Sequence, residues 1–151
     1  LRADPNYANA WMWRGNTKSY LGDAEGAIED LQQALRLNPL DLTLWIAHTG
    51  MANAHFLRGR YEEALSWVSM ALRQRPNSLS VLRVAIAAHA LAGNLDMARQ
   101  LSGRYRELDP DARLAKMREW WWFRRDEDVE KYLKGFRLAG MTECPNDRMP
   151  E

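Results

Sequence analysis

The chain has 151 residues, which is enough for one domain with a buried core and too few for two full ones. The composition, 46% hydrophobic and 27% charged, is that of an ordinary globular protein, and the net charge of +1 excludes nucleic-acid or lipid binding driven by bulk charge. No apolar run approaches the roughly 20 residues that a bilayer-spanning helix needs, so we expect no membrane insertion. The first residues, LRADPNYANA, are polar and lack both an initiator Met and the apolar stretch of a signal peptide, so we expect a fragment of a longer protein.

Proline, glycine and alanine recur along the chain with one shared spacing. The residues are Pro5, Pro39, Pro76 and Pro110; Gly22, Gly59 and Gly93; and Ala27, Ala64 and Ala98. The prolines are 34, 37 and 34 residues apart, and the glycines and alanines both step by 37 and 34. A fixed period of this length indicates a repeated supersecondary unit. We expect the three extra residues of the middle unit in LDLTLW, where they would lengthen its first helix by about one turn.

The first unit predicts two helices, over residues 8–20 and 24–37, joined by the turn LGD. Asp23 is placed to cap the second helix, whose apolar residues follow a helical period, and Pro39 ends it. The stretches GRYEEALSWVSMALRQRP and GNLDMARQLSGRYRELDP repeat this pattern. We therefore predict an all-α fold, an α-solenoid of about three helical hairpins that bury their apolar faces against their neighbours.

The stretch AWMWRGNTKSYLGDAEGAIEDLQQALRLNP resembles a tetratricopeptide repeat. The matching positions are Trp11, Gly15, Gly22, Ala27, Leu31, Ala34 and Pro39. The resemblance implies repeats at residues 8–41, 42–78 and 79–112, preceded by the end of another repeat in residues 1–7. Charged or polar residues replace the usual apolar ones at Arg14, Lys18, His48, His55 and His89, and Tyr105 replaces a small residue. RNA-binding pentatricopeptide repeats have a similar period, but the Trp-Gly-Ala-Pro pattern fits them poorly.

The same resemblance implies that the first helices of the repeats line a concave groove for a peptide or protein. The groove positions are Asn9, Met12, Asn16, Ser19, Tyr20, Ile46, Thr49, Asn53, Phe56, Leu57, Ser80, Arg83, Ala87 and Leu91. Asn16 and Asn53 correspond to asparagines that bond a ligand's backbone in the family, or they are simply polar residues on a solvated helix face. Met12 and Gly50 stand where the family's basic clamp for chaperone tails has Lys and Asn, so the resemblance implies a different ligand.

Residues 113–140 are predicted to be two capping helices, which contain the aromatic run REWWWFRRDED. In one interpretation the run closes the end of the solenoid: Trp120 and Trp121 are buried, Trp122 leaves the helix and Phe123 packs in the connection. In the other, Trp122, Arg124 and Arg125 form a patch for a partner protein or for stacked bases. Acids at residues 126–128 disfavour nucleic acid as that partner.

The last helix is predicted to start at the N-cap Asp126, to bury Val129, Tyr132, Leu133 and Phe136, and to stop at Gly140. Residues 141–151 are predicted to be a flexible tail, and its Cys144, the only cysteine, allows no internal disulfide, as in a cytoplasmic protein. The ending DEDVEKYLKGFRLAGM resembles the closing helix of tetratricopeptide regions that follow the catalytic domains of bacterial class III adenylate/guanylate cyclases. This resemblance implies a regulatory or assembly region of a larger signalling protein, with the metal and nucleotide residues outside this chain.

Catalytic chemistry finds little support in the sequence. The three histidines lack a second metal ligand at helical spacing, and we interpret them as packed residues that replace aromatics. There is no glycine-rich phosphate loop and no credible nucleophile, so we predict no catalytic residues, no metal site and no cofactor. The prediction is a non-catalytic module that binds a peptide, a protein or a sister domain of the same chain. Self-association into a homodimer is the alternative, and RNA binding is a distant third.

Overall fold

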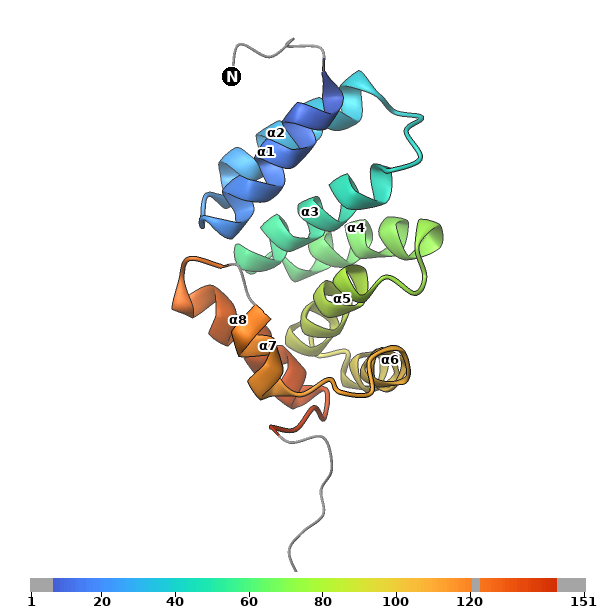
Figure 1. Ribbon diagram of the computed structural model, residues 1–151, viewed down its shortest axis with the longest axis vertical. Coiled ribbons are helices and arrows are strands. Elements are labelled where there is room, and N and C mark those ends of the chain that lie inside the picture. The colour runs from blue at the N-terminus through green and yellow to red at the C-terminus, as the bar shows by residue number, and fades with distance from the viewer. Residues whose placement is uncertain (1–6, 121–122, 144–151) are drawn as a thin grey trace, which may run out of the picture.

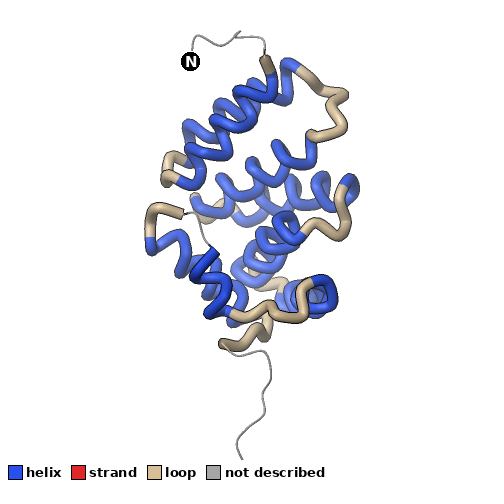
Figure 2. Tube along the Cα trace, in the orientation of Figure 1, coloured by secondary structure: helices blue, strands red, loops and turns tan. Residues whose placement is uncertain are grey.

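The computed structural model describes residues 7–120 and 123–143, and the side chains of all of these except residues 118–120. Within these residues the chain forms eight helices and no strand (Figure 2). The helices are α1 (Ala8–Tyr20), α2 (Ala24–Leu37), α3 (Leu44–Leu57), α4 (Tyr61–Gln74), α5 (Leu79–Leu91), α6 (Leu95–Leu108), α7 (Leu114–Trp120) and α8 (Asp126–Leu138). The first six stack as three hairpins, α8 packs against α5, and α7 lies beside α8 (Figure 1). None of the helices in the described residues is long and apolar enough to cross a membrane.

The glycine ladder marks the turns inside the three hairpins. Gly22, Gly59 and Gly93 have φ angles of 90°, 75° and 89°, a region that side-chain-bearing residues rarely adopt. The residue after each glycine donates its N–H to a carbonyl in the last turn of the preceding helix, as Asp23 does to Lys18 at 2.9 Å. The glycines therefore recur because the first helix of each hairpin ends in the same way, with a residue in the left-handed backbone conformation.

The first hairpin has the predicted bounds, and its second helix has the predicted cap. The Asp23 carboxylate accepts a hydrogen bond from the N–H of Gly26 at 3.0 Å. In the last helix Gly140, at a φ of 81°, provides the predicted stop. Asp126, however, is the first residue of α8 and not its cap, a position that Arg125 takes.

The first helix of the second repeat is longer than its counterparts by one residue, and not by the predicted turn. α3 has 14 residues against 13 in α1 and α5, so most of the insertion lies in the connection 38–43. The cause is Asp41, whose carboxylate accepts bonds from the N–H and the hydroxyl of Thr43, at 2.7 and 2.6 Å, and from the amide of Asn38 at 3.0 Å. Such local side-chain bonds compete with helix formation and hold the segment as a turn.

Arg14 and Lys18, which depart from the repeat pattern, share the buried carboxylate of Asp30. Arg14 donates two hydrogen bonds of 2.6 Å to its two oxygens, and the Lys18 ammonium lies 3.0 Å from Oδ2. Asp30 is only 3% exposed. The two cations thus replace apolar side chains because a buried acid on α2 needs partners.

The core is divided into two clusters along the solenoid. One is built from α1 to α3, and the other extends from α3 to α8. Trp67 of α4 packs against both. Of the predicted apolar stripe of α8, Tyr132, Leu133 and Phe136 are at most 2% exposed, and Val129 is half-buried. Met141, which begins the predicted flexible tail, is instead buried at 4% exposed.

Candidate functional site on the concave face

The predicted groove residues do not form one open surface. α8 crosses the face formed by α1, α3 and α5, runs past the C-terminal ends of α1 and α3, and packs against α5 (Figure 1). One group of predicted groove residues is buried beneath α8, a second lines an open pocket that Asn53 of the first group also borders, and a third lies at the far end. The three groups differ in burial and in their bonding partners.

Asn53 is the centre of the buried group. Its amide donates a 2.6 Å hydrogen bond to the hydroxyl of Ser19, and its carbonyl oxygen accepts the hydroxyl of Tyr132 in α8. Asn53 is 7% exposed and Ser19 is 1% exposed. The structure therefore uses Asn53, expected to bond a ligand, to hold its own closing helix.

Apolar groove positions are covered in the same way. Phe56 is fully buried, and its ring lies 4.5 Å from that of Tyr132, centroid to centroid. Ala87 faces Gly135 of α8 so closely that a Cβ on that glycine would lie 2.7 Å from the Cα of Ala87. Leu57 is 8% exposed, and its carbonyl accepts a 2.5 Å bond from the ammonium of Lys131. This half of the groove is filled by α8.

What remains open is a pocket of about 100 Å³, here called the concave pocket. Its lining residues are Asn16, Tyr20, Thr49, Asn53, Ser80, Arg83, Val84, Phe123 and Tyr132. Six of the nine are groove positions that the resemblance to tetratricopeptide repeats implied, whereas Phe123 lies just before α8 and Tyr132 within it. No sequence signal pointed to these two as pocket walls, because Tyr132 lies 79 residues from its partner Asn53.

Arg83 is the cation of the concave pocket. Its Nε donates a 3.2 Å bond to the Leu79 carbonyl one turn back, and among the described residues it pairs with no carboxylate. Burial raises the pKa of Tyr20 above its ordinary value, and the nearby charge of Arg83 acts in the opposite direction. Tyr20 and Tyr132 therefore stay neutral phenols at physiological pH, and the pocket carries the positive charge of Arg83.

Asn16 is the predicted ligand-bonding asparagine that remains available. Its amide donates a 2.9 Å hydrogen bond to the Met12 carbonyl. Its side-chain oxygen packs so close to Gly50 that a Cβ on that glycine would lie only 2.6 Å from it. Gly50 must therefore be small to accommodate Asn16. Thr49 hydrogen-bonds the Trp45 carbonyl at 2.6 Å and leaves its oxygen as an acceptor towards the pocket.

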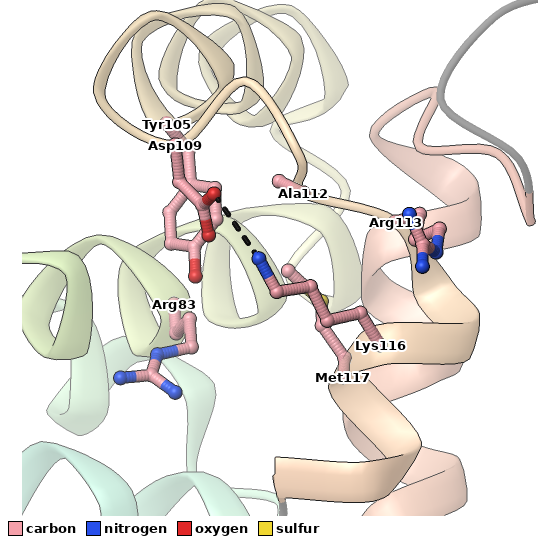
Figure 3. Close-up of a pocket in the computed structure, with 7 residues that line it drawn as sticks. All are labelled: Arg83, Tyr105, Asp109, Ala112, Arg113, Lys116 and Met117. Atoms are coloured by element: carbon pink, nitrogen blue, oxygen red, sulfur yellow. Dashed lines mark ion pairs between the residues drawn. The ribbon is translucent and has the colours of Figure 1, made fainter.

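The remaining groove predictions lie away from this pocket. Asn9 and the buried Met12 line a small hollow between α1 and the connection 38–43, and Ile46 packs against the N-terminal core cluster. Arg83 also borders a second small hollow on its other side, between α5, α6 and α7, where Asp109 pairs with Lys116 at 3.5 Å (Figure 3).

The three histidines behave as core residues. His48 packs against Trp67 with ring centroids 5.7 Å apart, and burial lowers the pKa of His48, His55 and His89. Each leaves its Nδ1 buried without a hydrogen-bond partner among the described residues. Within these residues no group of three or more His, Cys, Asp or Glu side chains could hold a metal ion.

The aromatic run is described only in part. Trp121 and Trp122 lie outside the described residues, and Trp120 is the last residue of α7, with its side chain outside them as well. Phe123 packs edge-on against Tyr20 at 5.2 Å and stacks on Tyr132 at 5.4 Å, centroid to centroid. This connection residue therefore links the end of α1 to α8.

Comparisons with known proteins agree with this geometry. Residues 20–84 match the tetratricopeptide repeat family model. The chain is 30% identical over 111 residues to a CTR9 homolog of Arabidopsis thaliana and 32% identical over 127 residues to human superkiller complex protein 3. These matches cover 73% and 83% of this chain but 10% and 7% of the relatives, so the chain spans a tenth or less of their length.

Two solved structures show the same fold. One is the first tetratricopeptide domain of Spaghetti (RPAP3) bound to the HSP90 peptide SRMEEVD, with a TM-score of 0.64 at 18% identity over 93% of this chain and 98% of that one. The other, the first such domain of human RPAP3, has a TM-score of 0.63 at 18% identity over 91% and 98%. The chain therefore has an α-solenoid fold of the tetratricopeptide type, and its residues 20–84 match the tetratricopeptide repeat model.

Proposed function

We propose that the chain is a non-catalytic interaction scaffold that binds a peptide, or a segment of a protein or sister domain, in the concave pocket. The tetratricopeptide fold is one that supports protein–protein interaction. The observation that carries the proposal is the convergence in one pocket of polar side chains from three successive first helices: Asn16 from α1, Thr49 from α3 and Arg83 from α5.

The chemistry of the pocket favours a ligand of mixed character. Arg83 offers guanidinium donors to a carbonyl or carboxylate, Asn16 and Thr49 offer polar atoms to a main chain, and Val84 with Phe123 offers apolar contact. The Spaghetti domain binds an acidic chaperone peptide. Here Met12 is buried and Gly50 is closed off by Asn16, which supports a ligand different from that peptide.

Peptide selection against the full chain, followed by two matched substitutions, tests this proposal. Arg83→Met is expected to weaken the selected peptides about tenfold or more, because it removes the only pocket cation among the described residues. Arg73→Met is the control, since Arg73 makes the same type of bond to a backbone carbonyl one turn back, at an exposed position of α4. Peptides that bind equally well to both variants would place recognition outside the pocket.

We also propose that the chain is the regulatory or assembly part of a larger signalling protein of the bacterial cyclase type. The support is the resemblance of residues 126–141 to the closing helix of the tetratricopeptide regions of those enzymes. Joining the chain to a class III cyclase catalytic domain is expected to make cyclase activity respond to peptides of the concave pocket. Activity that stays the same with and without such peptides would contradict it.

Self-association is the second candidate, and one surface favours it. Ala47 and Gly50 of α3 are buried, whereas the corresponding positions of α1, Ala10 and Trp13, have no helical hairpin before them within the described residues. Trp13 is 58% exposed. If this face pairs two copies, light scattering across a concentration range will show a dimer that Trp13→Ser disrupts.

A further inference from the structure

We infer that the face covered by α8 is a helix-binding surface, and that an amphipathic helix of a partner protein with the side-chain pattern of α8 can replace α8 there. The inference rests on the proposed function and extends it, because it specifies which kind of partner, an amphipathic helix, binds the part of the concave face that α8 covers. The bound helix is already visible: α8 is the ligand that this surface holds in the free chain.

The contacts of α8 with the solenoid are made across long stretches of sequence. The hydrogen bond between Tyr132 and Asn53 joins residues 79 positions apart, and that between Lys131 and the Leu57 carbonyl joins residues 74 positions apart. α8 packs mainly on α5, and far less on its chain neighbours α6 and α7. Contacts of this kind do not depend on local connectivity, so a separate molecule that presents the same groups satisfies them equally.

The surface selects its helix by shape. At Gly135 only a small residue fits, because a Cβ there would lie 2.7 Å from the Cα and 3.1 Å from the carbonyl oxygen of Ala87. Around it, Tyr132, Leu133 and Phe136 are buried. A fitting partner therefore carries an aromatic residue with a hydroxyl, a small residue three positions later and apolar residues beside them, on one face of a helix.

One feature of α8 leaves room for a better occupant. Asp128 is 4% exposed, and its Oδ2 accepts no hydrogen bond from the described residues, with the nearest cation, Arg125, 3.8 Å away. A buried carboxylate oxygen without a hydrogen bond weakens the packing of the helix that carries it. A partner helix with a neutral residue at this position avoids that cost.

The test uses a fluorescent peptide of residues 123–143 with Asp128→Asn, added to three full-length chains. In the wild-type chain the tethered α8 competes at high effective concentration, so we expect weak binding. Gly135→Val in the chain forces α8 off Ala87, and we expect at least tenfold tighter binding of the peptide. Gly103→Val on α6 is the matched control, since a Cβ at this helical glycine meets nothing within 4 Å, and it should bind as the wild type does.

The peptide provides its own negative control. A peptide that also carries Gly135→Val should fail to bind any of the chains, because its valine meets Ala87. A Gly135→Val chain that keeps its helical circular dichroism but binds the peptide no better than the wild type would overturn the inference. If that chain loses its fold, a Tyr132→Phe chain is used instead, because it removes the bond from α8 to Asn53. We expect this chain to bind the peptide about threefold more tightly than the wild type, and unchanged binding would overturn the inference.

Two further readouts separate the alternatives. A wild-type chain that is dimeric under the assay conditions and is dissociated by the peptide would assign the surface to a second copy, and so overturn the assignment to a partner protein. The ligands of the concave pocket are not used in this assay. An Arg83→Met variant that leaves those ligands unaffected would therefore reject the pocket proposal and leave the α8 result unchanged.

Discussion

The three hairpins and the closing helix are held in place by different kinds of contact. In α1–α6 each helix packs on its neighbour in sequence, and each hairpin turn is fixed by a glycine and a bond within a few residues of it. α8 packs instead on α5 and α3, through side chains that are far from their partners along the chain. Local sequence thus builds the solenoid, whereas tertiary packing decides what covers its concave face.

Two buried aspartates show the same contrast in electrostatic terms. Asp30 in α2 and Asp128 in α8 are 3% and 4% exposed. Burial raises the pKa of Asp30, but the bonds from Arg14 and Lys18 outweigh it and leave the pKa below the ordinary 3.8. Burial raises the pKa of Asp128 above 3.8, against the weaker attraction of Arg125. The repeat pairs its buried acid well, and the closing helix does not.

The largest expected effect tests whether α8 belongs to the core or only covers it. Phe136→Ala should lower the free energy of unfolding by about 3–5 kcal/mol, because it empties a fully buried site in the larger core cluster. Leu138→Ala on the same helix, at a side chain 41% exposed, should cost no more than about 0.5 kcal/mol. Urea unfolding measures both, and equal losses would mean that α8 is not part of the core.

A smaller effect is expected from the hydrogen bonds that connect the two regions. Asn53→Ala should cost about 2–3 kcal/mol, because it leaves the buried hydroxyls of Ser19 and Tyr132 without this partner. Asn16→Ala, which removes only a bond to a backbone carbonyl at the edge of the pocket, should cost about 0.5 kcal/mol. If urea unfolding gives the same value for both, Asn53 does not hold α8 to α3.

Asp30→Asn probes the repeat side of the contrast. We expect a loss of about 2 kcal/mol at neutral pH, since a well-paired buried carboxylate is removed but its cations are partly solvated. The folded-state pKa is lowered, so the wild-type advantage is full above the unfolded-state pKa and disappears as the pH falls through the folded-state value. Unfolding curves at neutral and acidic pH check this, and a difference that is independent of pH would contradict it.

Asp128→Asn probes the closing helix and should have the smallest effect, with the opposite sign. We expect a gain of about 1 kcal/mol at neutral pH, because the substitution removes a poorly paired buried charge. The raised folded-state pKa means that the wild-type chain recovers this stability as the pH falls through the folded-state value towards the unfolded-state value. A variant less stable than the wild type at neutral pH would show that Asp128 is well paired after all.

Sequence periodicity predicted much of the fold. The bounds of α1 and α2, the Asp23 cap and the stop at Gly140 depend on contacts within a few residues, which a sequence displays directly. The insertion was placed in the correct segment, but most of it lies in the connection before α3 and only one residue lengthens the helix. Helix propensity there gives way to the side-chain bonds of Asp41, and those depend on the turn's own geometry.

The candidate site was less predictable. The resemblance to tetratricopeptide repeats implied Asn16, Thr49 and Arg83 as groove positions, and they do line one pocket. It also identified Asn53 and Phe56, which lie beneath α8. Nothing in the register of a repeat shows that a helix from outside the repeat will lie across it.

By itself, then, the sequence determined the solenoid: which segments are helical, where each hairpin turns and which faces are apolar. These properties follow from short-range rules of helix periodicity and termination, repeated every 34 to 37 residues. Only the tertiary structure decided which groove positions are open. That choice depends on how Gly135 and Tyr132 fit against Ala87 and Asn53, a match of shapes and hydrogen bonds that exists only once distant segments are packed together.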